Sequence, residues 1–181
     1  DGQNEAAVQD LEHAIRLDPK NVDAYVLLGN IHSRLGNAGE AVKNYSQAIE
    51  LDPENPPLYL FRGVAYREFG EVEAAFDDLN RGLDLGLQSS IVFSQRGIAY
   101  SNIGDHAAAI KDFDRAIGLG FEDVPIDLRR GGYNNRANEH QSALQQDAQV
   151  FLYRGISHNA IGNFESAAQD LGQAITRYNR L

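Results

Sequence analysis

The sequence predicts an all-α protein, an α-solenoid of stacked antiparallel helix pairs. Glycines recur at a step of 34 residues in two sets: Gly29, Gly63 and Gly97, and Gly36, Gly70 and Gly104. Between these glycines, apolar side chains recur at three- and four-residue spacing, which is the period of an amphipathic helix. A single pair of such short helices cannot bury its own apolar face. Several copies must therefore stack to form a continuous core.

The same step joins residues of other kinds, so the repeat concerns a structural unit and not glycine alone. It joins the small residues Ala41, Ala75 and Ala109, the aromatic residues Tyr25, Tyr59 and Phe93, and the large residues Tyr45, Leu79 and Phe113. Gly155 begins the pattern once more, and we call Gly29, Gly63, Gly97 and Gly155 the ladder glycines. We expect a partial repeat with only its second helix at 1–20, repeats at 21–54, 55–88 and 89–122, an irregular or incomplete repeat at 123–147, and a C-terminal repeat at 148–181.

Each repeat is expected to contain two helices joined by a tight turn. In the repeat at 21–54, Tyr25, Leu28 and His32 share one face of a first helix, which ends near Leu35. A turn at Gly36 and Asn37 leads into a second helix. That helix must stop at Asp52-Pro53, because proline cannot continue a helix interior and restricts the residue before it. Glycine and alanine at fixed places let the helices approach closely.

The period breaks after the third ladder glycine. Gly131 keeps the step of 34, but the next match, Gly155, follows after only 24 residues, which leaves that repeat ten residues short. Two explanations stay open: the second helix is truncated there, or a stretch is missing from the sequence. The polar run at 134–149 agrees with both, and we expect it to be the least regular part of the solenoid.

The repeated pattern resembles the tetratricopeptide repeat, whose 34-residue unit carries an aromatic residue, Leu-Gly, Tyr, Ala, an aromatic residue and a closing Pro. The matching residues are Tyr25, Leu28, Gly29, Ala41, Tyr45 and Pro53. His32 stands in the Tyr place, and Leu87 and Phe121 replace the closing Pro, where Gly86 and Gly120 are expected to stop the helices. The resemblance implies a right-handed superhelix and a surface that binds other proteins.

The sequence lacks the patterns that carry catalysis or bind cofactors and metals. It contains no Cys, no His-Glu-x-x-His, no Gly-x-Ser-x-Gly and no phosphate-binding Gly-rich loop with Lys. Of the five His residues, His32 and His158 take places filled elsewhere by Tyr66 and Tyr100, so we expect them to pack in the core. The sequence therefore predicts no enzyme, no cofactor and no metal site.

Charge and hydropathy limit the class of partner. The net charge of −10 disfavours nucleic acid and acidic membrane surfaces. No apolar run approaches the roughly 20 residues that a spanning helix needs. We therefore expect a soluble chain, cytoplasmic by default. Because the chain begins at Asp1 and contains no Met, we also expect it to be part of a longer protein.

Charged residues follow the repeat as well. An arginine precedes three of the ladder glycines, and an aspartate stands sixteen residues after each arginine: Arg62 and Asp78, Arg96 and Asp112, Arg154 and Asp170. In the repeat at 21–54 both members change together, to Leu28 and Asn44. This pattern predicts an ion pair between the two helices of a repeat, since a partly buried Arg needs a carboxylate. The alternative is an exposed row of arginines that captures acidic ligands.

The resemblance places a binding groove on the concave face, which is lined by the first helices. The residues expected there flank the ladder glycines and are mostly apolar: Val26, Asn30, Ser33, Leu60, Val64, Arg67, Ile91, Ser94, Ile98, Ser101, Leu128, Leu152 and Ile156. Such a lining suits an amphipathic helix or an extended apolar peptide of a partner protein. Another segment of the parent protein is the alternative occupant.

One known subclass of these repeats binds C-terminal carboxylates of chaperone peptides through Lys, Asn and Arg. The corresponding residues here are Val26, Asn30, Phe61, Ile91 and Gln95, and only Asn30 matches. A carboxylate clamp is therefore not expected. Two alternatives to peptide binding stay open, namely self-association through the terminal repeats and a regulatory role within a larger enzyme.

Overall fold

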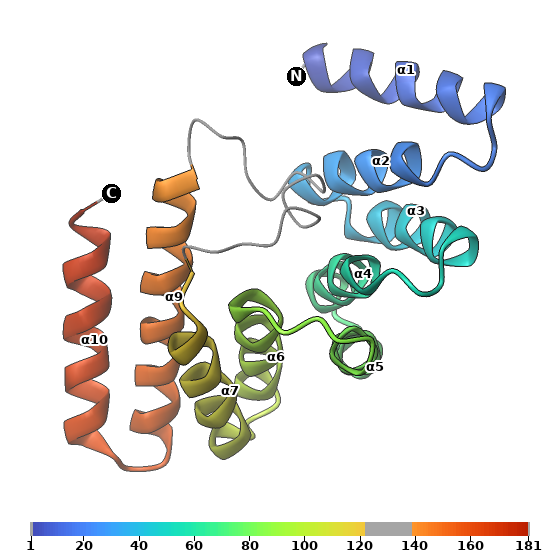
Figure 1. Cartoon of the computed structure of the whole chain (residues 1–181). Helices are drawn as coiled ribbons and strands as arrows, with labels where there is room; N and C mark the ends of the chain where they lie inside the picture. The colour runs from blue at the N-terminus through green and yellow to red at the C-terminus, as the bar shows by residue number, and fades with distance from the viewer. Residues whose placement is uncertain (1, 122–138, 181) are drawn as a thin grey trace. The chain divides into compact units, whose positions relative to one another are not determined.

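The computed structural model describes residues 2–121 and 139–180, and every regular element in these two ranges is an α-helix (Figure 1). The chain forms two compact units, Asp1–Leu87 and Gln88–Leu181. The prediction of an all-α fold built from consecutive helix pairs is confirmed.

Unit 1 contains two complete helix pairs and one additional helix. The pair α2–α3 packs on the pair α4–α5 through α3 and α4, and α1 packs on α2. The helices are α1 (Gly2–Leu17), α2 (Val22–Arg34), α3 (Ala38–Leu51), α4 (Pro56–Phe69) and α5 (Val72–Asp84).

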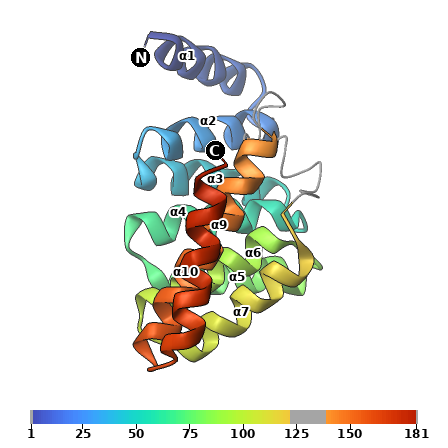
Figure 2. The same ribbon diagram turned by 90° about the vertical axis from the view of Figure 1, so that its left-hand side faces the viewer.

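Unit 2 contains two helix pairs. The pair α6–α7 packs on the pair α9–α10, mainly through α7 and α9. The helices are α6 (Ser90–Asn102), α7 (His106–Leu119), α9 (Glu139–Ala160) and α10 (Phe164–Tyr178), and Figure 2 shows α10 lying along α9.

Local sequence signals set the helix ends. The Asn21 side chain accepts a hydrogen bond from the backbone N–H of Ala24 at 3.0 Å, and Asp105 accepts one from Ala108 at 3.0 Å. These side chains satisfy N–H groups that have no partner within the helix. α3 ends at Leu51, as the Asp52-Pro53 pair predicts. Gly86 has φ +92° and Gly120 has φ +75°, so the predicted glycine stops are confirmed in a conformation that other residues rarely adopt.

The ladder glycines are the points of closest approach within a helix pair. A β-carbon at Gly29 would lie 2.5 Å from the Tyr45 ring, and one at Gly97 would lie 2.7 Å from the Phe113 ring. Both rings are buried. A larger residue at either glycine would therefore push the two helices of the repeat apart.

The contacts between successive repeats show how the chain continues past the break in the period. In unit 1 the rings of Tyr45 and Phe61 lie 5.8 Å apart, sixteen residues apart in sequence (61 − 45). In unit 2 the corresponding rings, Phe113 and Tyr153, lie 6.5 Å apart, but forty residues apart in sequence (153 − 113). The last repeat therefore stacks directly on the repeat at 89–122, with 24 additional residues between them.

A second pair of contacts gives the same offset. The Arg62 guanidinium donates to Ser46 Oγ at 3.1 Å over sixteen residues, and the Arg154 guanidinium donates to Asp114 Oδ1 at 2.6 Å over forty. The break in the period is thus an insertion between stacked repeats, an explanation that the sequence pattern did not suggest.

The expected irregular segment lies partly outside the described residues, which resume at Glu139. From Glu139 onward the expectation of irregularity at 134–149 is wrong, because these residues begin the regular 22-residue helix α9. The same helix runs across the expected boundary between the segments 123–147 and 148–181.

Deletion of residues 124–147 is expected to leave unit 2 folded, because it restores a step of 34 residues between Gly97 and Gly155. The deletion removes the partly exposed Asp147–Arg177 ion pair, which costs about 1 kcal/mol or less. Circular dichroism and thermal unfolding of the shortened chain check this result. A deletion of equal length through α6 and α7, residues 98–121, should abolish the cooperative unfolding of unit 2. Similar damage from both deletions would contradict the insertion.

Candidate functional site

The predicted lining residues occupy fixed places on the first helices of the repeats. Those three residues before a ladder glycine are Val26, Leu60, Ser94 and Leu152, and those directly after it are Asn30, Val64, Ile98 and Ile156. The first helices are α2 and α4 in unit 1 and α6 and α9 in unit 2. Within each unit, the repeat therefore places these side chains on equivalent faces of successive helices.

In unit 1 the predicted lining is mostly buried. Leu60 and Val64 have exposed fractions of 0% and 5%, and Val26 is buried as well. Asn30 accepts a hydrogen bond from the Tyr45 hydroxyl at 2.7 Å, which links the two helices of its repeat. These side chains therefore belong to the core and do not form the open apolar stripe that the sequence predicts.

The remaining two predicted residues of unit 1 are partly exposed and polar. The Ser33 hydroxyl donates to Glu68 Oε2 at 3.2 Å, and the Arg67 guanidinium lies 3.8 Å from the Glu68 carboxylate. The accessible part of this face in unit 1 is thus polar.

In unit 2 the lining is buried on α6 and open on α9. Ile91, Ser94 and Ile98 are buried, and the Ser94 hydroxyl donates to the Ile91 carbonyl at 2.8 Å. On α9, Leu152 is partly exposed and Ile156 is 44% exposed.

The first helices of unit 2 also contact each other on this face. The hydroxyls of Ser101 and Ser157 lie 3.3 Å apart and join α6 to α9. Leu128 lies outside the described residues. The accessible apolar part of the predicted lining is therefore on α9.

The predicted ion pairs are confirmed in all three repeats. Each arginine donates from Nε and one terminal nitrogen to the two oxygens of its aspartate, at 2.6–2.8 Å: Arg62 to Asp78, Arg96 to Asp112 and Arg154 to Asp170. The three aspartates are buried. The arginines thus join the helices of a repeat and are not an exposed row for acidic ligands.

The electrostatics of the pairs follow from this geometry. The hydrogen bonds to Asp78 and its negative charge raise the pKa of the Arg62 guanidinium, although burial opposes the shift. The pKa of Arg96 and that of Arg154 are raised for the same reason. A raised arginine pKa contributes stability that is fully present at neutral pH and is lost only in strong alkali.

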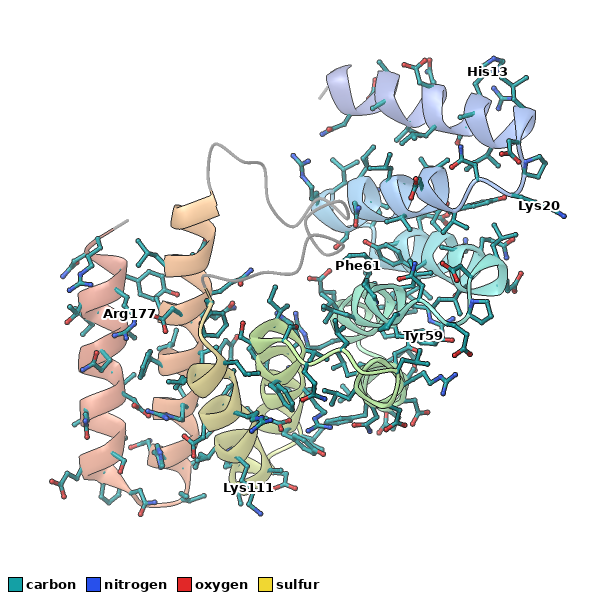
Figure 3. The ribbon with its side chains drawn as sticks, in the orientation of Figure 1. His13, Lys20, Tyr59, Phe61, Lys111 and Arg177 are labelled. Atoms are coloured by element: carbon teal, nitrogen blue, oxygen red, sulfur yellow. The ribbon has the colours of Figure 1, made fainter. Side chains whose placement is uncertain are left out.

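A similar arginine joins α9 and α10 near the C-terminal end of α10. Arg177 pairs with Asp147, and its guanidinium carbon lies 4.1 Å from the centroid of the Phe151 ring (Figure 3). A cation over an aromatic face adds to the attraction of the ion pair. Sequence periodicity did not indicate this residue, because its partner Asp147 lies outside the regular repeats.

Two sets of exposed apolar residues were missed in the sequence, although the period contains both. The first set stands six residues after each ladder glycine: Leu35, Phe69, Ile103 and Ile161. The second lies on α10: Phe164, Leu171, Ile175 and Tyr178. A comparison of burial between equivalent places, and not residue type, distinguishes these residues from the core.

Metal and membrane chemistry find little support in the described ranges. Among residues 2–121 and 139–180, no group of three or more His, Cys, Asp or Glu side chains is placed to hold a metal ion. None of the helices found there is both long enough and apolar enough to cross a bilayer.

Comparisons with known families agree with the repeat. A family model described as TPR repeat matches residues 1–36 and 35–70, and a second, described as Tetratricopeptide repeat, matches residues 92–119. A comparison with curated proteins finds no match.

Similar folds occur among solved structures. A structure of MamA from Desulfovibrio magneticus RS-1 has a TM-score of 0.76 at 14% identity, over 99% of this chain and 88% of that one. Cut9, in a crystal structure of the APC/C hetero-tetramer Cut9–Hcn1, has a TM-score of 0.75 at 18% identity, over 97% of this chain and 30% of the matched chain. A thermophilic TPR protein from Thermus thermophilus has a TM-score of 0.66 at 17% identity, over 97% of this chain and 84% of that one. At these identities the likeness concerns the fold alone.

Proposed function

Because the chain belongs to the tetratricopeptide-repeat family, we propose that it is a scaffold that binds a segment of a partner protein along its first helices. The observation that carries this proposal is the pair Leu152 and Ile156 on α9. These residues stand at the predicted lining positions and stay accessible in this structure. They are one helical turn apart, so their side chains form a single apolar contact area.

The chemistry of this area indicates the kind of segment that fits it. Two adjacent apolar side chains suit the apolar face of an amphipathic helix or an extended apolar peptide. The net charge of −10 disfavours an acidic tail. Among the similar folds, Cut9 is described as part of a hetero-tetramer with Hcn1, and that association agrees with a role in protein assembly.

The burial of the remaining lining changes how this proposal is tested. Leu60→Glu with Val64→Glu is the direct test if the whole face is open. Both side chains are buried, so these changes would damage the core and would not report on binding. Substitutions at the accessible residues of α9 avoid this problem.

Ile156→Glu is expected to weaken partner binding about tenfold or more, because a charge replaces a central apolar contact. The partner is first recovered by affinity capture with the 181-residue chain and identified by mass spectrometry. The segment that binds is then titrated, as a synthetic peptide, against the wild-type chain and the variant. Circular dichroism should show unchanged helical content.

Lys111→Glu on α7 is the matched control, since Lys111 is exposed on a second helix (Figure 3). We expect it to bind the peptide as the wild type does. If Ile156→Glu binds normally and Lys111→Glu does not, the partner uses the second helices and the proposed surface is wrong.

A further inference from the structure

The outward face of α10 is uncovered, although the equivalent face of other second helices is buried. Sixteen residues after each ladder glycine stands a large side chain. Tyr45 is 2% exposed and Phe113 is 0% exposed, whereas Leu171 is 36% exposed. Phe61 of the following repeat packs on Tyr45, and Tyr153 packs on Phe113. Among the described helices, α10 packs extensively on α9 alone.

The uncovered residues form one continuous stripe along α10. Phe164, Leu171, Ile175 and Tyr178 are all exposed, and Ala168 lies among them. At 3.6 residues per turn these five positions fall within about 80° of arc and span about 21 Å along the helix. Asp170, Ala174 and Ala167 point to the opposite side and are buried against the rest of unit 2. A contiguous apolar stripe of this kind marks an interaction surface.

The stripe is arranged symmetrically about its centre. Phe164 stands seven residues before Leu171, and Tyr178 stands seven residues after it. If two copies of α10 pack in antiparallel orientation around a two-fold axis, Leu171 meets Leu171 of the second copy. The same axis places Phe164 opposite Tyr178 of the second copy, which gives an aromatic pair at each end.

Charge and backbone also favour the antiparallel arrangement. Glu165 lies seven residues before Gly172 and Arg180 lies eight residues after it, so the axis brings each carboxylate beside the guanidinium of the other copy. A parallel arrangement would instead place Glu165 beside Glu165. A β-carbon at Gly172 would have no heavy atom within 4 Å, so the space beside this glycine is free for a second helix. The antiparallel helix dipoles add a small attraction.

We propose that the stripe Phe164–Leu171–Ile175–Tyr178 binds the same stripe of a second copy of this chain, and so forms an antiparallel homodimer. This interface is separate from the α9 surface that the proposed function uses. Variants in α10 should therefore leave binding of the partner peptide unchanged, and Ile156→Glu should leave dimerisation unchanged. The two proposals can fail independently.

Ile175→Glu is expected to abolish the dimer, because Ile175 is 61% exposed and the charge would lie within the apolar interface. Static light scattering at several concentrations should show the wild-type mass rising from 19.9 kDa towards twice that value. The variant should stay at 19.9 kDa with unchanged helical content. Ile103→Glu is the control, since Ile103 is similarly exposed at 55% but lies outside the stripe; it should dimerise normally. A wild-type chain that stays monomeric, or a dimer that Ile175→Glu does not affect, would overturn the proposal.

Disulfide cross-linking tests the antiparallel register, because the chain contains no Cys. Leu171→Cys should give a covalent dimer on oxidation, whereas Phe164→Cys alone should not. A mixture of Phe164→Cys and Tyr178→Cys chains of different tag length should give the mixed dimer. Efficient cross-linking of Phe164→Cys to itself would indicate a parallel pair and exclude the proposed arrangement.

Discussion

Replacing Arg96 by leucine is expected to lower the free energy of unfolding by about 3 kcal/mol. The Asp112 carboxylate is buried and accepts two hydrogen bonds from Arg96, at 2.7 and 2.8 Å. Removal of the arginine leaves this charge without its cation in a site that water reaches poorly. The guanidinium also lies 5.8 Å from the centroid of the Phe93 ring, and that attraction is lost as well. Urea denaturation followed by circular dichroism measures the change.

The repeat at 21–54 provides the control for this prediction. There, Leu28 and Asn44 stand in the places of Arg96 and Asp112. Leu28 is buried, and the Asn44 amide donates to the Glu40 carbonyl of its own helix at 2.9 Å. The double change Arg96→Leu with Asp112→Asn should therefore recover stability to within about 1 kcal/mol of the wild type. If the double variant is as unstable as the single one, the unpaired carboxylate is not the cause of the loss.

Gly97→Ala is expected to destabilise the chain by about 2 kcal/mol, although alanine favours helix by about 1 kcal/mol over glycine. The new β-carbon would lie 2.7 Å from the Phe113 ring, which is fully buried and has no room to move. Thermal unfolding should show a lower midpoint.

Gly155→Ala is the matched comparison, and it should be nearly neutral. The β-carbon at Gly155 would lie 3.2 Å from Leu171, a partly exposed side chain that can shift outward. Gly97→Ala combined with Phe113→Leu imitates this second pairing and should recover part of the loss. Equal destabilisation by Gly97→Ala and Gly155→Ala would show that the buried ring does not set the requirement for glycine.

The sequence was sufficient to predict the repeats and the ion pairs within them. Both depend on residues at fixed spacing inside one repeat, such as Arg62 and Asp78, so the 34-residue period places them correctly. Helix ends at Pro53, Gly86 and Gly120 were predictable for a similar reason, because proline and glycine act on the local backbone.

The stacking across the break could not be predicted in this way. An insertion and a truncated repeat both displace the next ladder glycine, so the sequence pattern does not distinguish them. Only the contacts of Phe113 with Tyr153 and of Asp114 with Arg154 show which repeats are neighbours.

The exposure of the lining residues was also beyond the sequence. Leu60 and Ile156 occupy equivalent faces of their helices, yet the first is buried and the second is exposed. Periodicity assigns a side chain to a face of its helix. Whether that face is covered depends on packing by distant parts of the chain, which the period does not describe.

The position of Arg154 has a consequence for the cooperativity of unit 2. Its guanidinium binds Asp170 in its own repeat and Asp114 in the preceding one, so a single side chain contributes to both the folding of a repeat and its coupling to a neighbour. In a linear array, the ratio of coupling to intrinsic stability decides whether a terminal repeat frays alone or unfolds together with its neighbour. Arg154 raises both quantities at once, and it ties the local opening of α9 and α10 to that of α7. Through this residue the inserted segment leaves the energetic continuity of the array intact.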